Sequence, residues 1–214
     1  MPKTSIPHLR REYRGRPLLE KGLPARPLPL FEKWFAEAVK ARLLDANACT
    51  VSTLTASSRP ASRTVLLKGV DAQGLSFFTN YESQKGRELA RRPYASLLLL
   101  WRELFRQVRV DGRVVKVSAA ESDAYFKTRP RGSQLGAWAS DQSRAIPDRA
   151  HLEARLKYFE REFKGMAVPR PPHWGGYRVL PDLVEFWQGR ENRLHDRVRY
   201  KLARGRWKRE RLSP

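Results

Sequence analysis

Four short segments of the chain concentrate cationic, hydroxyl and aromatic side chains at spacings that suit the binding of an anion. They are residues 63–68 (RTVLLK), 83–85 (SQK), 125–133 (YFKTRPRGS) and 185–197 (EFWQGRENRLHDR). A guanidinium group can form paired hydrogen bonds with phosphate oxygens, and a phenol or a hydroxyl adds single ones. These segments predict sites for phosphorylated small molecules, provided that the fold brings them together.

The first two segments also have ordinary explanations. Arg63 and Lys68 are an odd number of residues apart, so in a regular strand their side chains point to opposite faces unless a bulge intervenes. The ordinary explanation is that both are charges on an edge strand. A lysine at position 68 that pointed into a barrel would need an anion to offset its burial. Ser83 can cap a short helix whose free N–H groups, with Lys85, make an anion site, although most capped helices bind nothing.

The other two segments are denser in charge. Residues 125–133 place a phenol, two guanidinium groups and a hydroxyl at a helix end, which equally describes a solvated basic terminus. Residues 185–197 combine a tryptophan, three arginines and a histidine, and Arg193 and His195 share one face if the segment is extended. A strand that merely faces solvent does not need this density of functional groups.

Several other kinds of site are disfavoured by the sequence. It contains no glycine-rich phosphate loop, no HExxH and no Cys-x-x-Cys motif. The four histidines and one cysteine do not have the spacing of a metal cluster, so we expect no metal. Cys49 lies in an apolar, strand-like run, which favours a buried small side chain over a Cys–His nucleophile.

The elements that must position these segments follow from hydropathy patterns and turn residues. Helices are predicted over 29–44, 83–92, 119–127 and 148–163; strands over 48–56, 62–70, 75–79, 95–101, 107–118 (with a kink at Asp111–Gly112), 177–180, 183–188, 197–202 and 207–212. Strands and helices do not alternate regularly, which argues against a doubly wound parallel sheet. The expected fold is mainly β with flanking helices, an antiparallel barrel with helices packed outside. Residues 1–27 are basic and contain prolines, which predicts a mobile arm before a single domain over 28–214.

Composition narrows the partners. The 214 residues include 43 Lys and Arg against 22 Asp and Glu, a net charge of +21, which indicates an anionic partner: nucleic acid, an anionic membrane or phosphorylated small molecules. The longest apolar run, residues 97–101, is far shorter than the roughly 20 residues that span a membrane. The single cysteine and the absence of an apolar leader suit a cytoplasmic protein.

Taken together, the segments resemble the pyridoxine/pyridoxamine 5′-phosphate oxidase family. The matching pieces, in order, are RREY (10–13), RTVLLK (63–68), FFTNYESQK (77–85), Gln107, YFKTRPRGSQLGAWAS (125–140), Gln142–Ser143, WGGYRV (174–179) and EFWQGRENRLHDR (185–197). One piece would be a weak signal, but eight in order across nearly the whole chain are a strong one.

The resemblance implies an FMN-binding split β-barrel and a homodimer whose interface forms two sites. It implies oxidation of pyridoxamine 5′-phosphate and pyridoxine 5′-phosphate to pyridoxal 5′-phosphate, with O₂ as acceptor and H₂O₂ as product. One departure from the family is Gln84, where an arginine is usual. A neutral amide donates a weaker hydrogen bond to phosphate than a guanidinium does.

The family pattern also assigns roles to individual residues. FMN contacts fall on Arg63, Thr64, Val65, Leu66, Leu67, Lys68, Phe78, Thr79, Gln84, Lys85, Gln107, Gln142, Ser143, Trp187 and Arg197. Contacts to the vitamin phosphate are assigned to Lys68, Tyr125, Arg129 and Ser133. Contacts to the reacting pyridine are assigned to Arg193, Leu194 and His195, of which Arg193 and His195 are the catalytic residues. The arm that folds across the site comprises Arg10, Arg11, Glu12 and Tyr13. Gln142, Ser143, Trp187 and Arg197 are expected across the site from residues 63–68, which is the basis of the homodimer.

Two other functions remain open at this point. The basic, aromatic-bearing tail over 200–211 would suit a nucleic-acid-binding module. A split-barrel flavoprotein with another substrate is the second alternative. The charge inside residues 125–133 and 187–197, rather than only at the chain ends, favours small anions, so we expect no nucleic-acid partner. Flavin absorbance of the purified protein would separate these functions.

Overall fold

The structure is a computed structural model that describes residues 12–214, and these residues form two compact units. The unit that we call terminal comprises the described residues up to Ala46, together with Leu98–Val110 and Asp182–Pro214. The unit that we call central comprises Asn47–Leu97 and Asp111–Pro181. The domain boundary expected at residue 28 stays a prediction.

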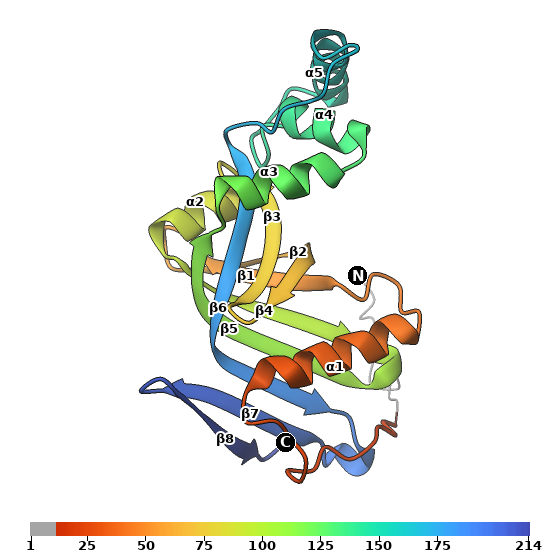
Figure 1. Cartoon of the computed structure of the whole chain (residues 1–214), viewed down its shortest axis with the longest axis vertical. Coiled ribbons are helices and arrows are strands. Elements are labelled where there is room, and N and C mark those ends of the chain that lie inside the picture. Colours follow the sequence, from red (N-terminus) through yellow and green to blue (C-terminus); the bar gives the residue numbers. More distant parts are fainter. Residues whose placement is uncertain (1–11) are drawn as a thin grey trace, which may run out of the picture. The chain divides into compact units, whose positions relative to one another are not determined.

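Helices and strands follow the sequence prediction closely (Figure 1). In chain order they are α1 (Pro27–Lys40), β1 (Ala48–Leu54), β2 (Pro60–Asp71), β3 (Gly74–Asn80), α2 (Gln84–Arg91), β4 (Tyr94–Trp101), η1 (Arg102–Leu104), β5 (Arg106–Lys116), α3 (Ala119–Thr128), α4 (Arg131–Ala139), α5 (Arg149–Glu162), β6 (Trp174–Gln188), η2 (Glu191–Arg193), β7 (Asp196–Ala203) and β8 (Arg206–Leu212). The two strands predicted over 177–180 and 183–188 form one strand, β6, and α4 was not predicted.

The strands form one hydrogen-bonded sheet in the order β3-β2-β1-β4-β5-β6-β7-β8. β3 also pairs with β6, so that β1 to β6 close into a barrel, and β7 and β8 extend from β6. The pairs β1–β2, β2–β3, β3–β6, β6–β7 and β7–β8 are all antiparallel. The expected class, an antiparallel split barrel with flanking helices, is confirmed.

In the central unit, burial alternates along β1, as it does in a strand with one face toward a core. β2 shifts its register between Leu67 and Gly69, as it does at a bulge. The sequence analysis allowed for a bulge near this segment without predicting one. β5 runs unbroken through Gly112, where a Cβ atom would lie 2.1 Å from the carbonyl oxygen of Leu180. A side chain would not fit at this position, because the two chain segments approach each other closely.

In the terminal unit, α1 begins with Pro27 in its first turn and packs its apolar face inward. Its Trp34 ring lies edge-on to Phe186 of β6, at 5.2 Å between centroids. The described part of the arm predicted over residues 1–27 forms hydrogen bonds with β7, and its mobility stays a prediction. The backbone N–H of Leu18 donates to Asp196 (3.0 Å), and the Tyr200 hydroxyl donates to the carbonyl of Pro24 (3.0 Å).

Over residues 12–214, no helix is long and apolar enough to cross a membrane. Within the same residues the structure groups no three His, Cys, Asp or Glu side chains that could hold a metal ion. Cys49 is buried, and burial raises the pKa of its thiol to about 12. It is therefore a small core side chain, as the strand-like run around it suggested.

Candidate active site

A pocket of about 480 Å³ in the central unit is lined by polar side chains from three parts of the chain. The lining residues are Ala61, Ser62, Arg63, Gln84, Lys85, Gln142 and Ser143. β2 supplies the first three and the start of α2 the next two, while the last two follow α4. Ser83 caps α2 as predicted, because its side chain accepts from the N–H of Gly86. We call this the anion pocket.

Lys85 is the most unusual side chain of the anion pocket. It is only 8% exposed, and its Nζ donates to two neutral oxygens, Thr79 Oγ1 (3.1 Å) and Gln142 Oε1 (2.8 Å). Burial and the nearby Arg63 lower its pKa to about 8, although Glu88 acts in the opposite direction. A buried ammonium group whose hydrogen-bond partners are neutral favours an anionic ligand beside it.

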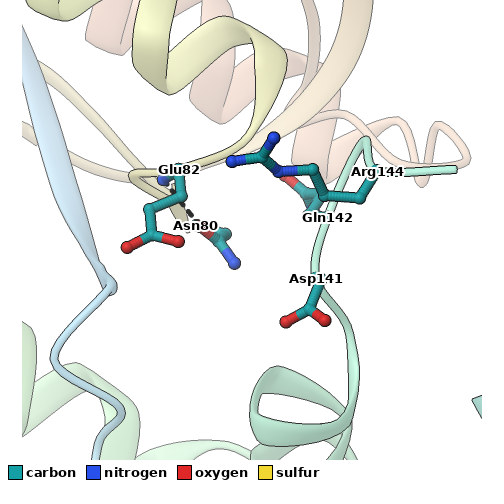
Figure 2. A pocket seen from close by; sticks show the side chains of 5 residues that line it. All are labelled: Asn80, Glu82, Asp141, Gln142 and Arg144. Atoms are coloured by element: carbon teal, nitrogen blue, oxygen red, sulfur yellow. Dashed lines mark hydrogen bonds between the residues drawn. The ribbon is translucent and has the colours of Figure 1, made fainter.

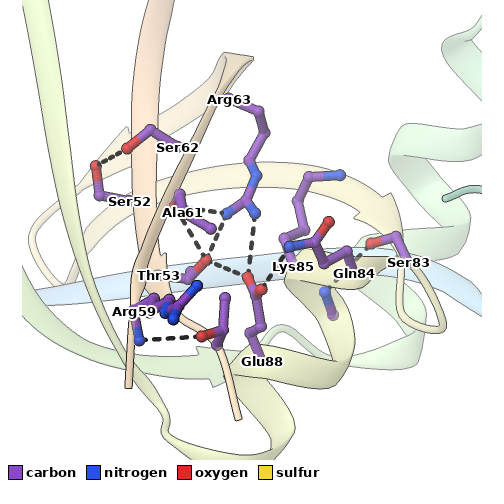
Figure 3. A network of polar contacts seen from close by, with 12 residues as sticks. Ser52, Thr53, Arg59, Ala61, Ser62, Arg63, Ser83, Gln84, Lys85 and Glu88 are labelled. Atoms are coloured by element: carbon purple, nitrogen blue, oxygen red, sulfur yellow. Dashed lines mark hydrogen bonds and ion pairs between the residues drawn. The ribbon is translucent and has the colours of Figure 1, made fainter. Parts of the chain in front are cut away.

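Arg63 and Gln84 reach the anion pocket through a polar network (Figure 3). Arg63 Nη2 lies 3.1 Å from Glu88 Oε2, and Gln84 Nε2 donates to Glu88 Oε1 at 2.8 Å. Thr53 Oγ1 donates to Glu88 Oε2 at 2.5 Å and accepts from Arg63 Nη1. Burial alone would raise the pKa of Glu88, but the bonds from Thr53 and Gln84 and the proximity of Arg63 lower it below its ordinary value. Glu88 is therefore ionised at neutral pH.

A second pocket, of about 380 Å³, shares Gln142 with the anion pocket (Figure 2). Its other lining residues are Asn80, Glu82, Asp141 and Arg144, so its charges are mixed. The loop that carries Gln142 is held by Arg155 of α5, whose Nε donates to the carbonyl of Ala139 (2.7 Å) and whose Nη2 lies 3.3 Å from Asp141.

The YFKTRPRGS segment spans the end of α3 and the start of α4. The Tyr125 ring stacks on Phe78 with 4.1 Å between centroids. The Arg129 guanidinium lies over Trp174 (4.6 Å) and Phe126 (5.5 Å). Its Nη1 is buried and has no hydrogen-bond partner within residues 12–214, and burial lowers the pKa of this arginine. A buried donor of this kind is typical of a ligand site, because it is costly to leave unpaired.

In the terminal unit, rings gather around Tyr13. Its ring lies edge-on to Phe105 (5.5 Å), Trp187 (5.6 Å) and His195 (5.4 Å). The Arg193 guanidinium lies 5.6 Å from the centre of the same ring. We call Tyr13, Phe105, Trp187, Arg193 and His195 the aromatic cluster. The chain approaches it closely at Gly15, whose N–H donates to the carbonyl of Gly189 and where a Cβ atom would lie 2.0 Å from Gln188 Nε2.

His195 has a defined orientation in the aromatic cluster. Its Nδ1 accepts a hydrogen bond from the backbone N–H of Arg190 at 3.0 Å, so the neutral ring carries its proton on Nε2. Burial and the Arg193 charge lower the pKa of His195, although the bond from Arg190 raises it. The imidazole is thus a neutral donor through Nε2 near pH 7.

Arg197 is held by its own chain. Its Nε and Nη2 both lie 2.9 Å from Glu185 Oε1, and its Nη1 donates to the carbonyl of Ser213 at 2.9 Å. Glu185 is 6% exposed and also faces Arg109 Nη2 at 3.6 Å. A buried carboxylate between two guanidinium groups fixes both in place.

The predicted site residues divide between the two units. The central unit holds Arg63, Thr64, Val65, Leu66, Leu67, Lys68, Phe78, Thr79, Gln84, Lys85, Tyr125, Arg129, Ser133, Gln142 and Ser143; the terminal unit holds Glu12, Tyr13, Gln107, Trp187, Arg193, Leu194, His195 and Arg197. Arg10 and Arg11 lie outside the described residues. The sequence analysis gave no site role to Thr53, Glu88 or Trp174, because a buried threonine, a helix glutamate and an apolar ring carry no signal of their own.

The structure adds detail to three expectations, while the site roles of these residues stay predictions. Lys68 is exposed, so the lysine that burial makes unusual is Lys85. Arg193 and His195 do not lie on an extended segment, because η2 turns the chain and Asn192 and Arg193 have φ values of 55° and 62°. Gln142 and Ser143 line one pocket with Arg63 inside a single chain, so a partner subunit is not needed to bring them to Arg63.

The anion pocket fits the phosphate of a mononucleotide. Arg63 and Lys85 supply cationic donors, Ser62 and Ser143 hydroxyl donors, and Gln142 an amide. Because Gln142 Oε1 is already occupied by Lys85 and Thr79, the amide offers its Nε2 group to a ligand. Donors of this type in a recess are what a phosphate monoester requires.

A closed six-strand barrel with a cationic pocket at the start of α2 defines the class of split-barrel proteins. Residues 35–161 match the family model described as pyridoxamine 5′-phosphate oxidase, and residues 174–214 match the pyridoxine 5′-phosphate oxidase C-terminal dimerisation region. The chain belongs to the pyridoxamine 5′-phosphate oxidase family, as the sequence predicted.

Individual relatives carry the name of this family. The chain is 56% identical to the pyridoxine/pyridoxamine 5′-phosphate oxidase of Acaryochloris marina over 99% of this chain and 97% of that protein. It is 50% identical to the protein of the same name from Synechocystis over the full length of both. Among solved structures, PhzG from Burkholderia lata, in complex with tetrahydrophenazine-1-carboxylic acid, is 34% identical with a TM-score of 0.88, covering 94% of this chain and 99% of that one.

Proposed function

We propose that this protein is an FMN-dependent oxidase that converts pyridoxamine 5′-phosphate and pyridoxine 5′-phosphate to pyridoxal 5′-phosphate. The observation that carries the proposal is the anion pocket, with Lys85 buried against neutral oxygens and Arg63 beside it. The family membership and the relatives named for this activity support it. FMN suits the pocket because its single terminal phosphate matches one recess.

When bound, FMN supplies the hydride acceptor for the CH₂–NH₂ or CH₂–OH group of the substrate, and the protein supplies position and charge. O₂ is proposed as the final acceptor, with H₂O₂ as product. Arg129 is the proposed anchor of the substrate phosphate, because its buried Nη1 has no partner in the part of the chain that the structure describes. The roles of Lys68, Tyr125 and Ser133 at that phosphate stay predictions.

Arg193 and His195 are proposed to act on the reacting end of the substrate. In this proposal the Nε2–H of His195 donates to the substrate, since its Nδ1 is occupied by Arg190. Arg193 adds a positive charge above the Tyr13 ring. The pair thus orients the pyridine, while Tyr13 and Trp187 exclude water from it.

The working form is proposed to be a homodimer in the cytoplasm. The match of residues 174–214 to a dimerisation region supports the dimer. A single buried cysteine is in line with a reducing compartment. Sedimentation at micromolar concentration tests the dimer, and full activity in a monomer would contradict it.

An absorbance spectrum and an oxidase assay test the function. The purified protein is expected to be yellow, to release FMN on denaturation, and to form pyridoxal 5′-phosphate from pyridoxamine 5′-phosphate with consumption of O₂. Recovery of FAD, or failure of added FMN to bind, would overturn the cofactor. Turnover of a tetrahydrophenazine carboxylate in place of the vitamin phosphate would favour the alternative, a split-barrel flavoprotein with another substrate.

A further inference from the structure

Glu88 occupies an unexpected position behind the anion pocket. It is 6% exposed and does not line the pocket, yet it bonds to two side chains that do, Arg63 (3.1 Å) and Gln84 (2.8 Å). A carboxylate near a phosphate site repels the ligand, and burying a charge is costly. Its presence here therefore needs a compensating role.

The contacts of Glu88 suggest that role. Oε2 receives Arg63 Nη2 and the hydroxyl of Thr53, and that hydroxyl in turn accepts from Arg63 Nη1 (Figure 3). Arg63 Nη1 also donates to the carbonyl of Ala61 (3.1 Å). The guanidinium is thus held by three oxygens on one side. An arginine side chain loses rotamer entropy when a ligand orders it, and a prearranged arginine has lost that entropy before the ligand arrives.

The same carboxylate explains the orientation of Gln84. Gln84 lines the pocket, but its Nε2 donates to Glu88 Oε1, one turn further along α2. The amide nitrogen of Gln84 is therefore hydrogen-bonded to the helix and does not point to a ligand. The substitution that separates this chain from the family pattern therefore engages Glu88. Arg63 is paired with Glu88, whereas Lys85 bonds to neutral oxygens in the described chain.

We propose that Glu88, with Thr53, is a positioning residue that fixes Arg63 for the phosphate group of a flavin mononucleotide. The inference rests on the proposed function, since it takes the anion pocket as the phosphate site. Glu88 acts through Arg63 and touches no ligand itself. The phosphate group is the part of the flavin that it serves, so its effect is confined to flavins that carry one.

The test compares FMN with riboflavin, which lacks the phosphate, by quenching of flavin fluorescence in wild-type apoprotein and in Glu88→Gln. If Glu88 positions Arg63, the variant binds FMN about tenfold more weakly, the loss of one charge-assisted hydrogen bond. Riboflavin affinity stays as in wild type. If Glu88 only adds repulsion, removing its charge tightens FMN binding, and that result overturns the proposal.

Two further pairs make the test specific. Thr53→Val removes the hydroxyl, while Thr53→Ser keeps it, so Thr53→Val is expected to weaken FMN severalfold and Thr53→Ser to restore it. Glu160→Gln removes a carboxylate from the exposed face of α5 and controls for net charge; it is expected to leave both affinities unchanged. An equal loss of both flavins in Glu88→Gln shows a merely structural role and overturns the proposal. Wild-type protein that binds neither flavin contradicts the proposed function instead.

Discussion

The anion pocket and the aromatic cluster handle charge in opposite ways. In the pocket, a lysine with a pKa of about 8 is buried among neutral oxygens, and its arginine neighbour is held by a buried carboxylate. In the cluster, a neutral histidine and an exposed arginine lie against rings. The first arrangement suits tight binding of a fixed anion, and the second suits orientation of a planar substrate. We infer a division of labour, with cofactor phosphate in one region and reacting ring in the other.

The largest expected effect concerns the stability cost of Lys85 in the apoprotein. Its folded pKa of about 8 lies below the ordinary 10.5, so below pH 8 both folded and unfolded states are charged and the full penalty, about 3 kcal/mol, is present. As pH rises from 8 to 10.5, the folded lysine is neutral while the unfolded one still binds a proton, and the penalty is lost. Lys85→Met is therefore expected to be more stable than wild type at pH 7, with a difference that shrinks above pH 8.

Urea unfolding of apoprotein at pH 7 and pH 9.5 measures this difference. Thr79 Oγ1 still donates to Gln142 Oε1 in the variant, so the change leaves these oxygens paired. Lys68→Met, at an exposed lysine of β2, is the matched control and is expected to show a difference that does not change with pH. If Lys85→Met were less stable than wild type at pH 7, the proposed cost of burying the charged Lys85 would be contradicted.

The aromatic cluster is expected to respond in kcat/KM. If Arg193 and His195 have their proposed roles, replacing either removes a contact to the reacting end, and about 3 kcal/mol of lost transition-state stabilisation is roughly a hundredfold in rate. Steady-state kinetics with saturating FMN measure the loss. FMN is expected to stay bound, and loss of flavin in Arg193→Ala would mean that this residue serves the cofactor.

Arg129 extends the comparison between the anion pocket and the aromatic cluster, because it is a third cation and lies over rings of its own. Arg129→Ala removes the proposed charge-assisted bond to the substrate phosphate and is expected to raise KM about thirtyfold, more than it lowers kcat. Pyridoxamine without its phosphate provides the control, since its turnover is expected to change little between wild type and variant. An equal loss for both substrates would remove Arg129 from the phosphate site.

The smallest effect is expected at Gln84. Gln84→Arg restores the family residue and adds a cation, which is expected to tighten FMN by up to about 1–2 kcal/mol. Part of that gain is lost if the new guanidinium takes over the bond from Gln84 to Glu88. Titration of apoprotein with FMN measures the change. Unchanged affinity would indicate that another cation, such as Arg87, already fills the role.

The sequence predicted the barrel and nearly every element because hydropathy alternation and turn residues are local signals. α4 was missed because RGSQLGAWA contains two glycines and its helically spaced apolar residues, Leu135, Trp138 and Ala139, cover only one turn. Arg155 of α5 also holds this last turn through the carbonyl of Ala139. The difference between exposed Lys68 and buried Lys85 depends on a bulge and on the packing of α2, which no local pattern encodes. No site role was predicted for Glu88 or Trp174 for the same reason, since their contacts are with residues distant in sequence.

The division of labour is tested most directly by FMN titration and rescue in two variants, Lys85→Ala and His195→Asn. Lys85→Ala is expected to bind FMN more weakly and to regain activity in excess FMN. His195→Asn is expected to bind FMN as wild type does and to stay slow at any FMN concentration. Rescue of His195→Asn by FMN, or wild-type flavin affinity in Lys85→Ala, would contradict the account.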